Sequence, residues 1–85
     1  MHSKLKSTEW IKTKSDFVEF MNLIVDDYNE NGKSWENKNL QDFIAAMAVY
    51  SNDVDGFYKN DKLGNPEIPT WKIFADIIMG SRIYE

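Results

Sequence analysis

The 85-residue sequence contains no cysteine, one histidine and four glycines. Without cysteine the chain cannot form a disulfide, a thiol nucleophile or a cysteine-ligated zinc site. The single histidine, His2, is the second residue, so a catalytic triad cannot be built in the usual way. The glycines, at positions 32, 56, 64 and 80, are too scattered for a phosphate-binding loop. We therefore expect no enzyme, no metal ion and no other cofactor.

Long apolar runs are also missing. No stretch of 18 apolar residues occurs, so we expect no segment that crosses a membrane. The first residues lack the apolar run of a secretion signal. A cytoplasmic location is the resulting expectation.

Charge is divided unevenly along the chain. Residues 1–14 hold four lysines and one glutamate, net +3, whereas residues 15–85 hold six basic and 13 acidic side chains, net −7. An acidic body lacks the basic face that nucleic-acid phosphates require, so we expect no nucleic-acid partner. We predict a basic, loosely ordered leader over residues 1–14 and a single helical domain over residues 15–85.

Residues 51–56, SNDVDG, resemble the middle of an EF-hand calcium loop. The loop would need an oxygen ligand first and a glutamate twelfth, but Ser51 and Lys62 occupy those places. We interpret this segment as a turn that ends a helix.

Helical periodicity predicts an all-α fold. The expected architecture is a compact bundle of three main helices, over about residues 15–31, 39–52 and 70–84, with a short helical turn near 53–58. Each helix is flanked by residues suited to capping or stopping it. These residues are Thr13 or Ser15, Asn31-Gly32, Asn37 or Asn39, and Thr70.

Residues 40–50, LQDFIAAMAVY, are apolar on nearly every side of a helix. Only Gln41 and Asp42 are polar, and both lie in the first turn. A helix that is apolar all round belongs in the interior, so we expect the other helices to pack on this one.

The predicted first helix has an acidic face, which is the first candidate site. This candidate partner face consists of Glu19, Leu23, Asp26, Asp27 and Glu30. Leu23 would be an apolar anchor inside an acidic ring that attracts a basic protein. An ordinary solvated helix face is the alternative interpretation.

Aromatic residues supply the second candidate. We expect a shallow pocket formed by Trp35, Phe57, Tyr58, Asn60 and Trp71, which would bind a peptide or a small ligand. The alternative is that these aromatics belong to the core and that the polar residues near them tie loops to it.

The predicted last helix is broadly apolar, and one side of it would suit a symmetric homodimer. That side is the arc around Ile73, Ile77, Gly80 and Tyr84.

A series of short motifs spans residues 16–85. They are Trp35-Glu36-Asn37, Leu40, Phe43, Asp55-Gly56-Phe57-Tyr58, Asn60, Pro69, Trp71, Phe74-Ala75 and Tyr84-Glu85. In this pattern the chain resembles a family of small bacterial proteins with no assigned function. The resemblance implies a bacterial, stand-alone helical domain, and it brings no catalytic residues.

Acidity, small size and the acidic helix face together favour a small protein-binding module. Its concrete form would be an inhibitor or immunity-type protein that covers a basic site on a bacterial partner. The alternative is a regulatory domain that binds a ligand or peptide in the aromatic pocket.

Overall fold

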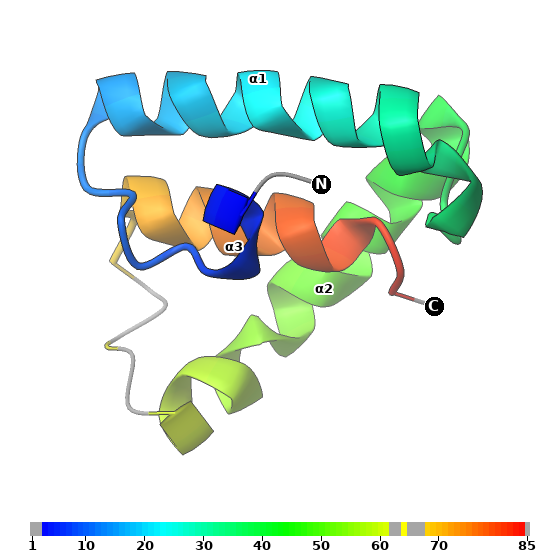
Figure 1. The fold of residues 1–85 in the computed structure, drawn as a ribbon. Helices are drawn as coiled ribbons and strands as arrows, with labels where there is room; N and C mark the ends of the chain where they lie inside the picture. Colours follow the sequence, from blue (N-terminus) through cyan, green and yellow to red (C-terminus); the bar gives the residue numbers. More distant parts are fainter. Residues whose placement is uncertain (1–2, 62–63, 65–67, 85) are drawn as a thin grey trace.

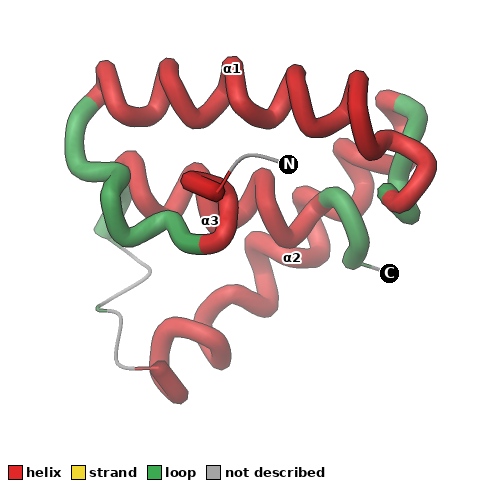
Figure 2. Tube along the Cα trace, in the orientation of Figure 1, coloured by secondary structure: helices red, strands yellow, loops and turns green. Residues whose placement is uncertain are grey.

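The computed structural model describes residues 3–61, 64 and 68–84. In chain order its elements are a short 3-10 helix η1 (Ser3–Lys6), α1 (Lys14–Asn31), a 3-10 turn η2 (Gly32–Ser34), α2 (Leu40–Asp61) and α3 (Trp71–Ser81). No strand occurs in these described ranges (Figure 2). The predicted all-α fold with three main helices is confirmed.

The last helix, α3, holds the central place. It packs against both α1 and α2, while α1 and α2 are not a closely packed pair among the described elements. Figure 1 shows α1 running above α3, and α2 crossing on the other side of it. The domain is therefore organised around α3.

The main core is formed where α1 meets α3. Its buried side chains are Leu5, Ile11, Phe20, Ile24, Trp35, Ala75 and Ile78. Phe20 and Ala75 lie at its centre without solvent exposure. A second, smaller cluster joins α2 to α3 through Val54, Tyr58 and Ile73.

The prediction that residues 40–50 form the buried centre is wrong. Leu40 is 77% exposed and Ile44 is 53% exposed, and within this segment only Ala46 is buried. The physical reason is that α2 has a single close helical neighbour, α3, which covers one side of it. The remaining apolar side of α2 faces outward.

The predicted end of the central helix near residue 52 is also wrong. The helix continues to Asp61, so the expected turn at 53–58 is part of α2. Gly56 costs a helix about 1 kcal/mol relative to alanine. Val54 and Tyr58, on either side of it, are buried against α3, and their burial outweighs that cost.

The helix starts follow the capping predictions. Thr13 and Asp16 form a reciprocal capping box at the start of α1. At the start of α2, the Asp42 backbone N–H donates to Asn39 Oδ1 at 2.8 Å, and Asn39 Nδ2 donates to the Asp42 carboxylate at 3.0 Å. Thr70 accepts a bond from the backbone N–H three residues on and caps α3.

The end of α1 falls at Asn31 as predicted, but by a different mechanism. Gly32 has φ −57°, so it is not left-handed. A Cβ at Gly32 would lie 3.2 Å from the Tyr28 ring. Glycine here therefore leaves room for that ring as the chain turns through η2.

Residues 3–14 contribute to the domain core. Leu5 and Ile11 are buried in the main core, and Trp10 packs against it. The Trp10 Nε1 donates to the carbonyl of Lys4 at 2.9 Å. The described residues of the predicted leader, 3–14, form a strap that packs over α3.

The chain after α3 is held by a loop residue. The helix ends at Ser81 rather than at residue 84. Asn37 donates through Nδ2 to the carbonyls of Ser81, at 2.9 Å, and Tyr84, at 2.7 Å. Asn37 thereby joins the α1–α2 loop to the C-terminal turn.

Gly80 allows α2 to approach α3 closely. A Cβ at this position would overlap the ring of Tyr50 from α2. Ile73 is buried and Ile77 is half-buried in the same α2–α3 contact. The arc predicted to form a homodimer is therefore largely covered by α2 of the same chain. The prediction that this side of the last helix is exposed is wrong.

The two helical glycines give a matched test. Gly80→Ala should lower the free energy of unfolding by about 1–3 kcal/mol, because the Tyr50 ring must move. Gly56→Ala should raise it by about 0.5–1 kcal/mol, because nothing lies within 4 Å of its Cβ and alanine favours the helix. Urea unfolding followed by circular dichroism measures both, and stabilisation by both variants would contradict the assigned contact.

Candidate functional site

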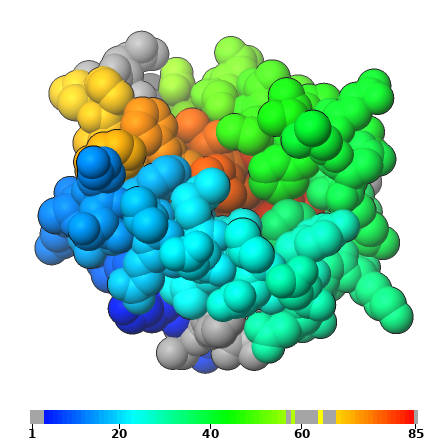
Figure 3. Space-filling model, turned by 90° about the horizontal axis from the view of Figure 1, so that it is seen from above, coloured from blue at the N-terminus to red at the C-terminus, as the bar shows by residue number. Residues whose placement is uncertain are grey.

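An open apolar groove lies between α1 and the first half of α2. It has a volume of about 570 Å³. Its walls are Met21, Val25 and Tyr28 of α1 and Leu40 and Ile44 of α2. Figure 3, seen from the α1 side, shows α1 (blue to cyan) beside the first half of α2 (green), with atoms of α3 (orange to red) between them.

The floor of the groove belongs to the main core. Trp35 stacks on Phe43 with ring centroids 5.6 Å apart. The rings of Tyr28 and Trp35 form a T-shaped pair with centroids 5.1 Å apart. Ile24 and Ile78 complete the floor from α1 and α3. Because the floor is fixed by core packing, the groove is a preformed feature of the fold.

Few of the described residues that line the groove have amide or charged side chains. They are Asn29, Asn37, Lys38 and Asn39. Asn37 is already bonded to the C-terminal turn, and the carbonyl of Lys38 accepts a bond from the Tyr28 hydroxyl at 3.2 Å. The groove therefore offers a chiefly apolar surface.

The five residues of the predicted acidic face do not share one exposed surface. Glu19, Asp26 and Glu30 are exposed on α1, and Glu19 pairs with Lys4 of the strap. Leu23 is half-buried against the main core, because the interior side of α1 reaches that far round the helix. It is a core contact and not the exposed anchor that was predicted.

Asp27 was assigned to the same face, and this assignment is wrong. Its side chain is 5% exposed and accepts bonds from Trp35 Nε1 at 2.9 Å and Arg82 Nη1 at 3.1 Å. Asn31 donates to its other oxygen at 3.3 Å. Asp27 thus joins α1, the loop and the C-terminal turn.

These donors also set the ionisation of Asp27. Burial by itself would raise the pKa of this carboxyl. The hydrogen bonds from Trp35, Asn31 and Arg82, together with the Arg82 charge, outweigh burial and hold the pKa of Asp27 below its usual value. Asp27 is therefore an ionised anchor for the Trp35 indole beneath the groove.

The predicted aromatic pocket is not formed as a unit. Trp35 lies beneath the groove, whereas Trp71 packs on Phe17 near the start of α1, and Tyr58 is buried between α2 and α3. Trp35, Tyr58 and Trp71 therefore belong to three separate packing contacts. The side chains of Phe57 and Asn60 lie outside the described part of the structure.

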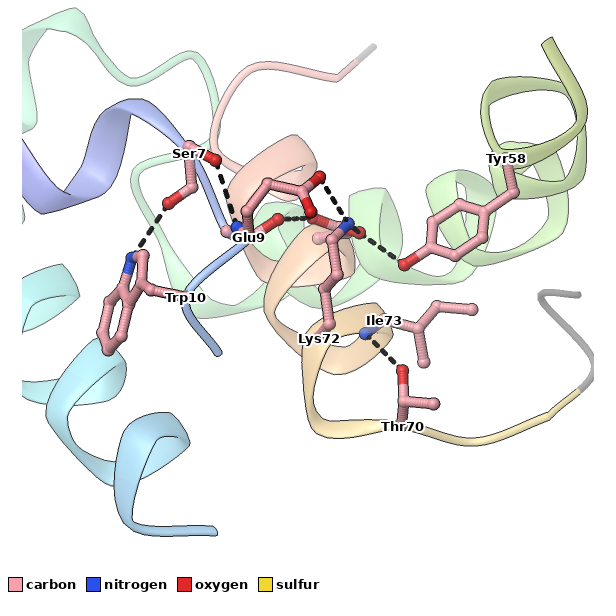
Figure 4. Close-up of polar contacts among 9 residues, drawn as sticks. Ser7, Glu9, Trp10, Tyr58, Thr70, Lys72 and Ile73 are labelled. Atoms are coloured by element: carbon pink, nitrogen blue, oxygen red, sulfur yellow. Dashed lines mark hydrogen bonds and ion pairs between the residues drawn. The ribbon is translucent and has the colours of Figure 1, made fainter. Parts of the chain in front are cut away.

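Tyr58 belongs instead to a polar cluster around the buried Asp76. Its hydroxyl donates to Asp76 Oδ2 at 2.5 Å, Lys72 Nζ donates to the same oxygen at 2.9 Å, and Thr8 donates to Oδ1. Figure 4 shows Lys72 between Glu9 and the Tyr58 hydroxyl. Burial and the bond to Asp76 raise the pKa of Tyr58. This cluster fastens the strap and α2 to α3.

Neither a membrane-spanning helix nor a cluster of metal ligands occurs among the described residues. Across residues 3–61, 64 and 68–84, no helix is long and apolar enough to cross a membrane. Nor does this part of the chain bring together three histidine or acidic side chains that would hold a metal ion.

Sequence reasoning missed the groove walls. Met21, Val25 and Tyr28 recur at four and three residues on α1, beside the stripe that is actually buried. The apolar set of α1 is thus wider than one contact with α3 needs. The surplus of apolar residues on α1, together with that on residues 40–50, is the sequence feature that could have revealed the groove.

The geometry defines a small all-α domain with a preformed apolar groove. Residues 13–85 match the Family of unknown function (DUF7660), and the chain belongs to that family. The expected membership of a family without an assigned function is confirmed. A search of curated proteins and a search of solved structures each returned no match.

The lowered pKa of Asp27 predicts that the free energy of unfolding depends on pH. A carboxyl with a lowered folded-state pKa stabilises the fold above the unfolded pKa of about 4, and this contribution is lost as pH falls through the folded pKa. Asp27→Asn should therefore lower the free energy of unfolding by roughly 2–3 kcal/mol at neutral pH, with a smaller deficit in acid.

Urea unfolding at about pH 7 and about pH 2.5 measures the deficit. The control is Asp55→Asn, an exposed position on α2, which should change stability by less than about 0.5 kcal/mol. An Asp27→Asn deficit of equal size at both pH values would show that the charge is not what stabilises the network.

Proposed function

We propose that this chain is a small acidic protein-binding module, and that it holds an apolar segment of a protein partner in the α1–α2 groove. The observation that carries the proposal is the exposure of the groove walls. Leu40, Ile44, Val25, Tyr28 and Met21 are each at least 40% exposed and line one groove. Contiguous apolar surface of this kind is typical of interaction sites.

The openness of the groove favours a protein segment over a small molecule. Small-molecule sites enclose most of the ligand and place a few polar groups to orient it. Here the walls stand open to solvent, and the amide and charged side chains of the lining are those of Asn29, Asn37, Lys38 and Asn39. A partner's side chains would supply the missing cover.

The acidic surface of α1 supports the finer form of the proposal. Asp27 is buried against Arg82, and the other charged side chains of Lys14–Asn31, four acidic and one basic, carry −3. A partner that presents basic residues beside an apolar segment would be attracted to this helix. Occupation of such a basic site would make the module an inhibitor or immunity-type protein.

Selection of binders from a displayed random-peptide library against the immobilised chain tests the proposal. Enriched peptides should lose binding at least about tenfold to Ile44→Asp, because a carboxylate enters the apolar wall. They should bind Ile83→Asp like the parent, because Ile83 is similarly exposed, at 57%, but lies outside the groove.

Circular dichroism melts establish that both variants stay folded. Enrichment of peptides that bind Ile44→Asp as tightly as the parent would place recognition elsewhere and overturn the proposal. A library that yields no binder to the folded parent would overturn it as well.

A further inference from the structure

A second cavity, with a volume of about 470 Å³, lies between the strap, α2 and α3. Strap residues 5–9 form one wall, and Tyr50 contributes from α2. None of the residues that line this cavity lines the groove, so it is a separate site on the domain. Its volume is in the range of small-molecule pockets. The lining residues from α3 are Lys72, Asp76, Met79 and Gly80.

The buried carboxylate of Asp76 already has its hydrogen-bond partners in the chain. Thr8 donates to Oδ1, and Tyr58 and Lys72 donate to Oδ2. The Lys72 ammonium, at 2.9 Å, also compensates the charge of Asp76. A ligand in the cavity therefore gains little from Asp76 itself. The carboxylate instead holds the Lys72 ammonium in place at the cavity.

Two donor side chains of the cavity have unused hydrogen-bonding capacity. An ammonium has three N–H groups, and Lys72 donates one of them to Asp76. Across residues 3–61, 64 and 68–84, neither the remaining N–H groups of Lys72 nor the half-buried Tyr50 hydroxyl has a hydrogen-bond partner. Burial, followed by the Asp76 charge, raises the pKa of Tyr50, so its hydroxyl stays protonated and can donate. An acceptor group of a ligand would satisfy these donors.

Packing fixes the position of the Tyr50 ring. A Cβ on Gly80 would lie 2.4 Å from Tyr50 Cε1, so glycine at this position lets the ring lie directly on the α3 backbone. Tyr84 forms a T-shaped pair with the same ring, with centroids 5.0 Å apart. The unpaired hydroxyl of Tyr50 is therefore held by contacts of its ring and needs no hydrogen bond of its own to stay in place.

The unused donors favour a carboxylate as one group of the ligand. A carboxylate accepts hydrogen bonds from a hydroxyl and from an ammonium, and it pairs with the ammonium charge. Glu9 opposes a lone carboxylate, because its Oε1 lies 3.9 Å from Lys72 Nζ (Figure 4). A ligand that also carries an ammonium group close to its carboxylate would be attracted by Glu9 instead.

The charge of the lining agrees with a ligand of both signs. Two lysines, Lys6 and Lys72, and two acidic residues, Glu9 and Asp76, line the cavity, so its charged side chains balance. A ligand without net charge meets no net repulsion from such a lining. The zwitterion of an α-amino acid has no net charge and bears its two ionised groups on one carbon atom. This close spacing suits the neighbouring charges of Lys72 and Glu9.

We propose that the cavity binds a free α-amino acid with an aliphatic side chain. Its carboxylate accepts hydrogen bonds from Lys72 and Tyr50, and its ammonium group pairs with Glu9. Leu5 and Met79 supply apolar surface for its side chain. The inference goes beyond the proposed function, which concerns the groove. Binding here would link the strap, α2 and α3 through one small molecule.

Three probes with the same carbon branch test the proposal in amide NMR titrations of the full chain. They are L-leucine, its analogue without the ammonium group, 4-methylpentanoate, and its analogue without the carboxylate, 3-methylbutylamine. L-Leucine should bind with a Kd of about 1 mM or lower and shift the signals of residues 5–9 and 72–80. Each analogue should bind at least about tenfold more weakly, because it lacks one of the two charged groups.

The variant Tyr50→Phe isolates the role of the hydroxyl. It keeps the ring on Gly80 and removes a group that has no hydrogen bond to the described residues. It should weaken leucine binding at least about fivefold and change the Tm by less than about 3 °C. The control is Tyr84→Phe, whose lost hydroxyl donates to Asp53 outside the cavity. Leucine affinity in this control should change less than about twofold.

Four results would overturn the proposal. The first is no saturable shift with leucine at about 20 mM, and the second is equal leucine affinity in Tyr50→Phe and the parent. The third is binding of either analogue as tight as that of leucine, which would exclude the amino acid as the ligand class. The fourth is a set of shifts confined to the groove residues Leu40 and Ile44. The displayed-peptide test of the groove is independent of all four, because Ile44 does not line the cavity.

Discussion

The burial of α3 between α1 and α2 is the constraint on which the rest of the structure depends. Phe20 of α1 packs on one side of this helix, and Val54 of α2 packs on the other. Because α3 has only 11 residues, it covers one side of each longer neighbour and leaves the rest of α1 and α2 apart. The groove is the space that this unequal length produces, and its floor is the outer surface of the core.

Two buried carboxylates hold the chain ends to this arrangement. Asp27 fixes the Trp35 indole and Arg82 together, so the C-terminal turn closes against the loop before α2. Asp76 gathers Thr8 and Tyr58, so the strap and the second half of α2 close against α3. Neither carboxylate lies in the groove. Their bonds stabilise the scaffold around the groove.

The sequence predicted those features that local chemistry determines. Thr13, Asn39 and Thr70 satisfy N–H groups of the turns that follow them, so the helix starts could be placed from the residues alone. Which side of a helix is buried depends on the neighbours it meets. Asp27 was assigned to the surface because its type is usually solvated, and its partners Trp35 and Arg82 approach only in the fold. The groove walls were missed for the same reason.

The apolar character of residues 40–50 is therefore not explained by burial in the core of their own chain. A helix that is apolar all round has two stable environments: the interior of its own domain, or a domain side together with a partner. Here α3 occupies the interior, and Leu40 and Ile44 remain exposed at the edge of a preformed groove. Exposed side chains of this kind contribute nothing to the core and favour aggregation unless something covers them. An occupant of the kind proposed would bury them.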